Sequence, residues 1–172
     1  GTQMVKLDPN AQVDGVFALW YGKGPGVDRS GDVFKHGNIA GCSQHGGVLL
    51  VAGDDHACRS SSLPHQSEHA FIAAMIPVLN PSGVREFIEF GLHGYAMSRY
   101  SGCWVGFKAI SDTIESSSSF DIDPMAVEIK IPDTYPIPPD GFHLRWPDPP
   151  LEQENRLQRE RLAAFREYIA DV

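Results

Sequence analysis

The sequence is poor in cysteine and has no long hydrophobic run. Its three cysteines, Cys42, Cys58 and Cys103, lie far apart and form no CxxC pair. This spacing argues against a disulfide framework and against a zinc or iron–sulfur motif, so we expect reduced thiols. No apolar stretch approaches the roughly 20 residues that cross a bilayer, and the first residues lack the pattern of a secretory leader. We therefore expect a soluble, cytoplasmic protein.

Positive charge is also scarce. The 172 residues include 14 Lys and Arg against 22 Asp and Glu, which gives a net charge of −8. A nucleic acid or an anionic membrane surface requires a basic face on the protein, so we expect neither as a partner. The length suits one domain with a sizeable core and is short for two domains.

One polar stretch directly follows a strongly apolar one. Residues 48–52 read Val-Leu-Leu-Val-Ala, which is typical of a buried strand in a parallel sheet. The run ends at Gly53, and Asp54, Asp55 and His56 follow at once. Ligands of open α/β sheets bind outside the carboxyl ends of the strands. We therefore predict a site here, with Asp55 and His56 as catalytic residues and Asp54 in cofactor binding.

Other roles for this triplet stay open. Adjacent residues at the end of an extended strand point to opposite sides, which disfavours a metal site made from the triplet alone. Acid–base work or substrate orientation is favoured instead, because a carboxylate and a nearby histidine shift each other's pKa. A purely structural role for Asp54 is the alternative, since aspartate commonly caps a following turn.

A serine-rich turn and two histidines come next. Ser60 and Ser61 lie in the turn, and His65, Gln66 and His69 open a predicted helix. We assign these five residues to substrate binding. His65 and His69 are four residues apart and would share a helix face, but the HExxH pattern is absent. We therefore predict no metal site.

A glycine-rich sequence follows a second predicted strand. Residues 15–21 have the composition of a buried strand, and residues 22–28 then read Gly-Lys-Gly-Pro-Gly-Val-Asp. The spacing matches neither a P-loop nor a dinucleotide-binding fingerprint. Because glycine has no side chain, the backbone here can approach a ligand closely, and we assign Gly22, Lys23, Gly24 and Gly26 to cofactor binding. A structural turn between strand and helix is the alternative.

Strands and helices alternate along most of the chain. We predict helices at residues 31–41 and from residue 82 onward, and strands at residues 75–79, 102–110 and 127–131, the last as an edge strand. Residues 1–5 have the pattern of a helix end. Such alternation is typical of right-handed βαβ crossovers. We predict an α/β fold with a parallel sheet flanked by helices.

The composition changes after residue 131. Prolines are concentrated between Pro132 and Pro150, which predicts an extended linker. Residues 151–172 form a charged amphipathic pattern that is typical of a helix. We therefore divide the chain into an α/β domain at 1–131, a linker at 132–150 and a terminal helix at 151–172. That helix either begins a further segment or straps back onto the sheet.

Several long blocks of the sequence resemble one enzyme family. They are LWYGKGPGVDRSGDVFKHGNIAG, GGVLLVAGDDHACRSSSLPHQSEHAF, residues 75–117 and RWPDPP. In this order they are similar to the long, single-chain bacterial indolepyruvate ferredoxin oxidoreductases, over almost the whole chain up to about Pro150. The resemblance implies the pyrimidine-type domain of a thiamine-diphosphate-binding fold, with its N-terminal strands missing here.

The resemblance also implies an activity. Such enzymes use thiamine diphosphate with Mg²⁺ to decarboxylate indolepyruvate and other aryl 2-oxo acids oxidatively onto coenzyme A, and they pass the electrons through iron–sulfur clusters to ferredoxin. The cofactor would be shared with another domain or a second copy of the enzyme, and the clusters would lie outside this chain.

Two departures limit what this chain can do by itself. The family's pyrimidine-contacting glutamate would precede Gly1, and the diphosphate motif GDG followed by Asn is absent. We therefore expect this chain to be inactive alone. A non-catalytic scaffold or interaction domain with the same fold is the alternative.

Overall fold

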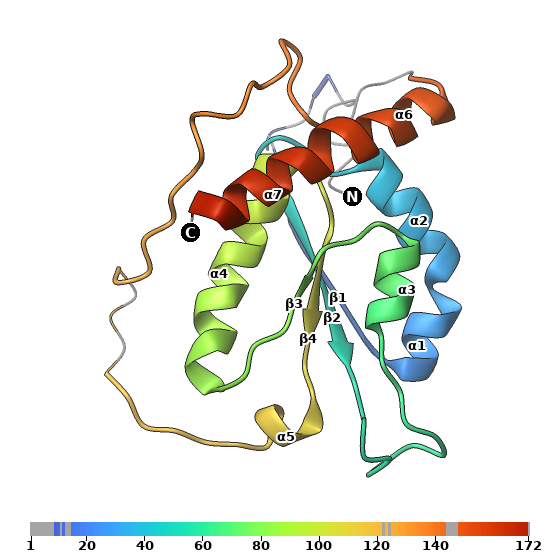
Figure 1. Ribbon diagram of the computed structural model, residues 1–172, viewed down its shortest axis with the longest axis vertical. Coiled ribbons are helices and arrows are strands. Elements are labelled where there is room, and N and C mark those ends of the chain that lie inside the picture. The colour runs from blue at the N-terminus through green and yellow to red at the C-terminus, as the bar shows by residue number, and fades with distance from the viewer. Residues whose placement is uncertain are drawn as a thin grey trace.

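Four parallel strands form the centre of the molecule (Figure 1). The computed structural model describes residues 9–10, 12, 15–121, 123, 125–143 and 148–171, so the helix end predicted at residues 1–5 lies outside the described residues. The strands are β1 (Phe17–Lys23), β2 (Gly47–Gly53), β3 (Val78–Leu79) and β4 (Val105–Lys108). Their order in the sheet is β1-β2-β4-β3. The predicted α/β fold with a parallel sheet flanked by helices is confirmed.

Helices cover both faces of this sheet. One face carries α1 (Gly24–Arg29), α2 (Gly31–Ala40) and α3 (Glu68–Ala73), and the other carries α4 (Val84–Ser101) and the C-terminal helix. From β1 through β2 to β3 the chain moves in one direction across the sheet, and it then returns through α4 to β4. A right-handed crossover that reverses direction must use the opposite face, which places α4 where it is.

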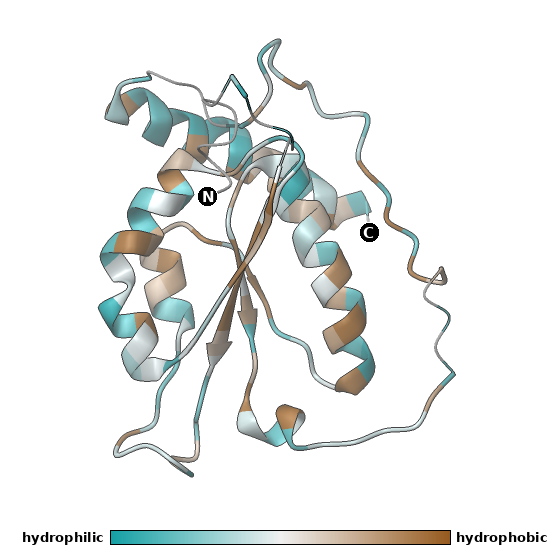
Figure 2. Cartoon of the chain, turned by 180° about the vertical axis from the view of Figure 1, so that it is seen from behind, coloured by the Kyte–Doolittle hydropathy of each residue, from teal (hydrophilic) through white to brown (hydrophobic). Residues whose placement is uncertain are grey.

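β2 is the central strand because its side chains are apolar on both sides. Val48, Leu50 and Ala52 pack with the helices of the first face, and Leu49 packs on the α4 side. A strand covered on both faces has a continuous apolar sequence. Figure 2 shows the strands in brown between helices that carry both hydrophilic and hydrophobic residues. The buried strand predicted at residues 48–52 is therefore confirmed.

β1 is an edge strand, which corrects the buried strand predicted at residues 15–21. Phe17, Leu19 and Tyr21 are 56%, 57% and 80% exposed, whereas Ala18 and Trp20 pack against the core on the other face. An apolar composition made β1 resemble β2. On the α4 side Phe17 contacts the Tyr95 ring of α4, whereas Leu19 and Tyr21 lie exposed, so this face is covered mainly at the start of the strand.

The glycine-rich sequence is also not a loop. Gly22 and Lys23 end β1, and the helix α1 begins at Gly24 with Pro25 in its first turn. Proline suits the start of a helix, because its fixed φ is helical and its missing N–H would have no partner there. The sequence therefore changes from strand to helix without an intervening loop.

Two predicted strands differ from the structure. The strand predicted at residues 75–79 is reduced to β3, because Met75 has a φ of 56° and Pro77 has no backbone N–H to give to a ladder. Residues 127–131 form no strand. Ile129 and Ile131 instead line a cavity beside α4. Alternate residues of an extended backbone point to the same side, which explains why both isoleucines line the cavity that α4 also lines.

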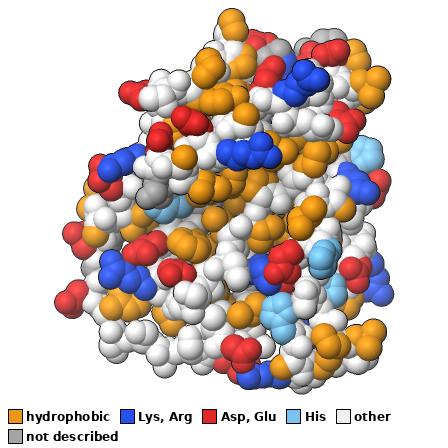
Figure 3. Space-filling model, in the orientation of Figure 1, with side chains coloured by type: hydrophobic (Ala, Val, Ile, Leu, Met, Phe, Trp, Pro, Cys, Tyr) orange, Lys and Arg blue, Asp and Glu red, His pale blue; other side chains and the backbone are white. Residues whose placement is uncertain are grey.

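The C-terminal helix packs back onto the domain. It consists of α6 (Pro150–Arg156), the π-helical turn η2 (Leu157–Arg161) and α7 (Leu162–Asp171), and it lies across the end of the sheet in Figure 1. Ala164, Phe165 and Tyr168 join the core on the α4 side. Hydrophobic side chains gather just below α7 in Figure 3. The helix therefore straps back onto the core on the α4 side.

One buried arginine links the C-terminal helix to the rest of the domain. Arg161 is 1% exposed, and it donates hydrogen bonds to Phe142 O at 2.6 Å and to Ile39 O at 2.9 Å. Ile39 lies in the last turn of α2, whose terminal carbonyls lack helical partners and favour a cation. Gly41 follows with a φ of 79°, and a Cβ there would lie 2.6 Å from the Arg161 guanidinium. Residues 132–150 thus connect parts of one packed unit.

Candidate functional site

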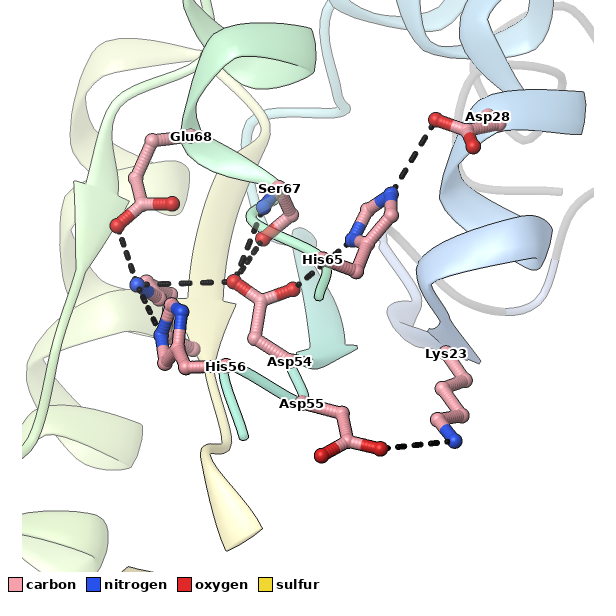
Figure 4. Close-up of polar contacts among 9 residues, drawn as sticks. Lys23, Asp28, Asp54, Asp55, His56, His65, Ser67 and Glu68 are labelled. Carbon is pink, nitrogen blue, oxygen red and sulfur yellow. Dashed lines mark hydrogen bonds and ion pairs between the residues drawn. The ribbon is translucent and has the colours of Figure 1, made fainter. Parts of the chain in front are cut away.

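The carboxyl ends of three adjacent strands bring charged side chains together (Figure 4). β1 ends at Lys23, β2 is followed by Asp54 and Asp55, and β4 ends at Lys108. β1, β2 and β4 are neighbours and parallel, so these ends meet at one edge of the sheet. The site predicted at the end of residues 48–52 is therefore joined by residues from both neighbouring strands.

Asp54 is buried and fully occupied by the chain itself. Its Oδ2 accepts hydrogen bonds from the Ser67 backbone N at 3.0 Å and from Ser67 Oγ at 2.8 Å. Lys108 Nζ lies 3.6 Å from the same oxygen. Ser67 is the N-cap residue of α3, so Asp54 joins the end of β2 to the start of α3. The sequence left capping of the following turn as the alternative role for Asp54, but that turn is held by Asp55, which accepts from the Arg59 and Ser60 backbone N atoms.

Lys108 is the charged centre of the site. Its ammonium is nearly buried and contacts Asp54 and Glu68, and it lies 3.4 Å from His56 Nε2. Burial opposes ionisation of Glu68, but the hydrogen bond from Lys108 and smaller contributions outweigh it, so the pKa of Glu68 lies below its usual value. Glu68 Oε2 is buried and has no hydrogen-bond partner among the described residues.

Asp55 points away from Asp54, toward the first strand (Figure 4). Its carboxylate accepts hydrogen bonds from the Arg59 and Ser60 backbone N atoms at 2.8 and 2.9 Å. Those two hydrogen bonds, with a further contribution from Lys23 at 3.3 Å, lower the pKa of Asp55 to about 2. Asp55 therefore stays ionised at neutral pH and organises the serine-rich turn. The predicted opposite orientation of adjacent residues is confirmed.

His65 bridges two carboxylates. Its Nδ1 lies 3.5 Å from Asp54 Oδ1, and its Nε2 lies 3.3 Å from Asp28 Oδ1. The imidazole packs against the start of α1, where a Cβ on Gly24 would lie 2.2 Å from His65 Cγ. The glycine is thus required by the histidine, which is a different reason from the close approach to a ligand that we predicted.

A cavity of about 440 Å³ lies beside this cluster. Four of the residues that we assigned to binding line it, namely Lys23, Ser60, Ser61 and His65. Lys23 Nζ donates a hydrogen bond to Ser60 Oγ at 2.5 Å across its wall. Such a volume falls in the range of small-molecule sites. The glycine-rich sequence and the serine-rich turn therefore face each other across one cavity, as two separate stretches of sequence.

The remaining predicted residues lie elsewhere around the cluster. Gln66 and His69 are exposed, and neither lines the cavity. His56 is exposed and adjoins Lys108 rather than the cavity. A Cβ on Gly22 would lie 2.6 Å from the Trp20 ring, and a Cβ on Gly26 would lie 3.9 Å from the same ring. Figure 3 shows histidine side chains on the surface near α3, with acidic and basic side chains around them.

Sequence reasoning missed Lys108 and Glu68. Lys108 is the last residue of a buried strand, so the argument that selected Asp54 could also have selected it. Glu68 stands next to Ser67 at the start of α3 and offered no such signal. The set of groups can accept hydrogen bonds and transfer protons. No group of three metal-ligating side chains occurs in the part of the chain that the structure describes.

The cysteines take no part in this site. Cys42 and Cys103 are buried in the core, and burial raises their pKa to about 11 and about 12. A thiolate is the reactive form of cysteine, so neither thiol serves as a nucleophile at neutral pH. All three cysteines are free.

Comparison with known proteins adds no relative. No family model matches the chain, and neither the curated proteins nor the solved structures gave a match. Within the described residues, no helix has the length and apolar character needed to span a membrane. The fold and site thus define an α/β protein with a parallel sheet and a charged cluster at the carboxyl ends of its strands.

Proposed function

We propose that this chain is the pyrimidine-side domain of a thiamine-diphosphate-dependent 2-oxoacid:ferredoxin oxidoreductase. The substrate would be indolepyruvate or another aryl 2-oxo acid, with coenzyme A as acyl acceptor and ferredoxin as electron acceptor. One observation carries the proposal. The two most distinctive blocks of the resemblance, around Gly22–Asp28 and Gly53–His69, are far apart in sequence and converge on one cluster and one cavity.

The side chains of the cluster suit the aminopyrimidine ring of thiamine diphosphate better than its diphosphate and Mg²⁺. The buried, unpartnered Oε2 of Glu68 can accept a hydrogen bond from an amino group. The described residues offer no set of carboxylates for Mg²⁺. The chain would therefore hold the aminopyrimidine ring, and a second domain or a second copy would supply the diphosphate and Mg²⁺ site. The bound cofactor would supply the nucleophilic carbon for decarboxylation.

The chain's own residues would position groups and move protons. Asp54 fixes Lys108 and the start of α3, and Lys108 in turn lies beside His56 and Glu68. His56 begins the turn that follows Asp55, and its Nε2 lies 3.4 Å from Lys108 Nζ. An imidazole can act as a general acid or base, and the contact with Lys108 matters because proton transfer requires accurate geometry. His56 would carry the acid–base role and Asp55 would hold the neighbouring turn.

The test uses the longest natural protein that contains this chain. The purified protein should reduce ferredoxin anaerobically with indolepyruvate, and the reduction should require both coenzyme A and thiamine diphosphate. Lys108→Met should abolish this activity while the protein keeps its circular dichroism spectrum. Absence of any thiamine-dependent turnover in a folded, cluster-containing preparation would overturn the proposal.

A scaffold or interaction domain is the second candidate, and one observation favours it. Asp54 and Asp55 are satisfied by hydrogen bonds and ion pairs within the chain, which is what a purely structural cluster requires. Calorimetric titration tests the shared-site arrangement by itself. The 172-residue chain should bind thiamine diphosphate with Mg²⁺ weakly or not at all, and micromolar binding would contradict the shared-site arrangement.

A further inference from the structure

A second and larger cavity lies at the opposite end of the sheet. Its volume is about 560 Å³, and its walls come from the start of β1, from α4 and from residues 129–143. Phe17 begins β1, and His45 precedes β2, whereas the charged cluster follows the last residues of the same strands. The two cavities therefore lie at opposite ends of parallel strands, and no residue lines both.

The walls of this cavity are mainly apolar and aromatic. Phe17 and Tyr95 meet edge to face with their ring centroids 5.1 Å apart. Leu92 of α4 and Ile129 and Ile131 of the extended segment complete the wall, and all three are about half exposed. Exposure of such apolar side chains to water is unfavourable in free energy, and a bound apolar group would remove this surface from water. The volume lies within the range of sites for drug-sized ligands.

Among the described residues that line this cavity, Arg99 is the one lysine or arginine, and its Nη2 lies 3.0 Å from His45 Nδ1. The described lining residues include no aspartate or glutamate, although the chain has 22 acidic residues and a net charge of −8. Glu167 and Asp171 lie near the Tyr100 hydroxyl. An acid-free wall with one guanidinium is complementary to a single negative charge, and arginine binds carboxylates through paired N–H donors.

A buried hydroxyl adds a second polar feature. Tyr100 lines the cavity and is 8% exposed, and its hydroxyl has no hydrogen-bond partner among the described residues. Burial raises the pKa of Tyr100, so the hydroxyl stays protonated. A buried hydroxyl without a partner is unfavourable, and a polar atom of a ligand would satisfy it. This combination of apolar walls and few polar groups is typical of ligand sites.

We propose that this cavity binds an amphipathic organic monoanion, with its carboxylate on Arg99 and its apolar body between α4 and residues 129–143. The body can be aliphatic or aromatic, since the wall presents both kinds of side chain. The site is separate from the charged cluster, so it stands whether or not the proposed enzyme activity does.

Calorimetric titration of the 172-residue chain tests this proposal with three probes. Dodecanoate and 2-naphthylacetate carry the charge on an aliphatic and an aromatic body, and dodecan-1-ol lacks the charge. We expect saturable one-to-one binding of at least one carboxylate and clearly weaker binding of the alcohol. Which carboxylate binds more tightly identifies the body. Failure of both carboxylates to bind, or equal binding of dodecanoate and the alcohol, overturns the proposal.

Three variants locate the binding. Arg99→Gln should weaken carboxylate binding roughly 1.5-fold to fivefold, the range for an exposed ion pair. Arg85→Gln removes an equal charge from the same helix outside the cavity and should leave binding unchanged. Ala96→Trp should block the cavity and abolish binding. Equal effects of the two arginine variants would place the anion elsewhere.

Sedimentation at several concentrations examines a competing occupant. If the chain self-associates, if Ala96→Trp prevents the association and if no carboxylate binds, the cavity is an interface between copies and the ligand proposal is wrong. Because Arg99 is exposed, its variant should fold even if the tryptophan variant does not.

Discussion

The two ends of the sheet carry different kinds of side chains: charged groups at the carboxyl ends of the strands and apolar groups at the amino ends. At the carboxyl ends, the buried Lys108 ammonium contacts the carboxylates of Asp54 and Glu68. At the amino ends, the cavity is walled by apolar and aromatic side chains with one arginine. Buried charges keep their places through directional contacts, whereas apolar walls depend on volume and packing. The charged cluster and the apolar cavity therefore lie at opposite ends of the sheet and depend on different interactions.

The largest effect on stability is expected from removing the buried carboxylate of Asp54. Asp54→Ala leaves Lys108 with one carboxylate partner and leaves Ser67 without its acceptor. Breaking a buried ion pair costs about 3–5 kcal/mol, so we expect a loss of about 3 kcal/mol in the free energy of unfolding, measured by urea denaturation. In a double-mutant cycle with Lys108→Met the losses should be less than additive. Full additivity would show that the pair is not coupled.

The matching change at the apolar end is Phe142→Ala. Phe142 is 2% exposed and contacts the Tyr100 and Tyr135 rings about 6 Å away. Its truncation should lower the free energy of unfolding by about 3 kcal/mol, with little dependence on salt. The loss from Asp54→Ala should change with salt, because charges interact there. Equal salt dependence of the two variants would contradict the contrast between the ends.

Catalysis should distinguish two histidines at the charged end. In the natural protein that contains this chain, His56→Ala should lower kcat by roughly 100-fold, the scale for losing a general acid or base. Cofactor affinity should change little. His69→Ala, on the exposed side of α3, is the matched control and should have a much smaller effect. If His69→Ala proved the more damaging with folding intact, the acid–base role would belong to the other side of the turn.

Acid should affect the charged end first. The pKa of Asp55 is lowered to about 2 in the folded chain, against about 4 for an unfolded aspartate. Its contribution to stability is therefore present above pH 4 and is lost as the pH falls from about 4 to 2. Asp55→Asn should flatten the pH dependence of unfolding in that window. Asp32→Asn, on the exposed surface of α2, should not.

The smallest effect is expected on the exposed part of β1. Tyr21 is 80% exposed, so Tyr21→Thr keeps a strand-forming residue and should change the free energy of unfolding of the chain by less than about 0.5 kcal/mol. The same change can be made in the longer natural protein. A loss well above 1 kcal/mol there would show that another part of that protein covers this face.

Local sequence pattern was sufficient for the main elements. The run at residues 48–52 is apolar on every residue, which favours a strand covered on both faces. The position of Asp54 and Asp55 followed from it, because they come directly after the strand. The same pattern could not distinguish β1 from β2. Whether a strand has a neighbour on each side is not a property of its own residues.

Long-range contacts account for most of the rest. Asn38 of α2 is a polar residue that is fully buried. Its Nδ2 donates to Ala74 O at 2.9 Å, and its Oδ1 accepts from Trp104 N at 2.9 Å. The side chain thus joins α2, the end of α3 and the segment before β4. Nothing within a few residues of Asn38 indicates those partners.

The sequence by itself determined the alternation of strands and helices and the polar stretch at the end of the central strand, because both depend on periodicity and on neighbours in the chain. Tertiary structure alone decided which charges meet. Lys108 reaches Asp54 only because β4 lies beside β2, and Arg161 reaches α2 only because the C-terminal helix folds back. Partners separated by tens of residues are fixed by the order of strands in the sheet, which no local pattern encodes.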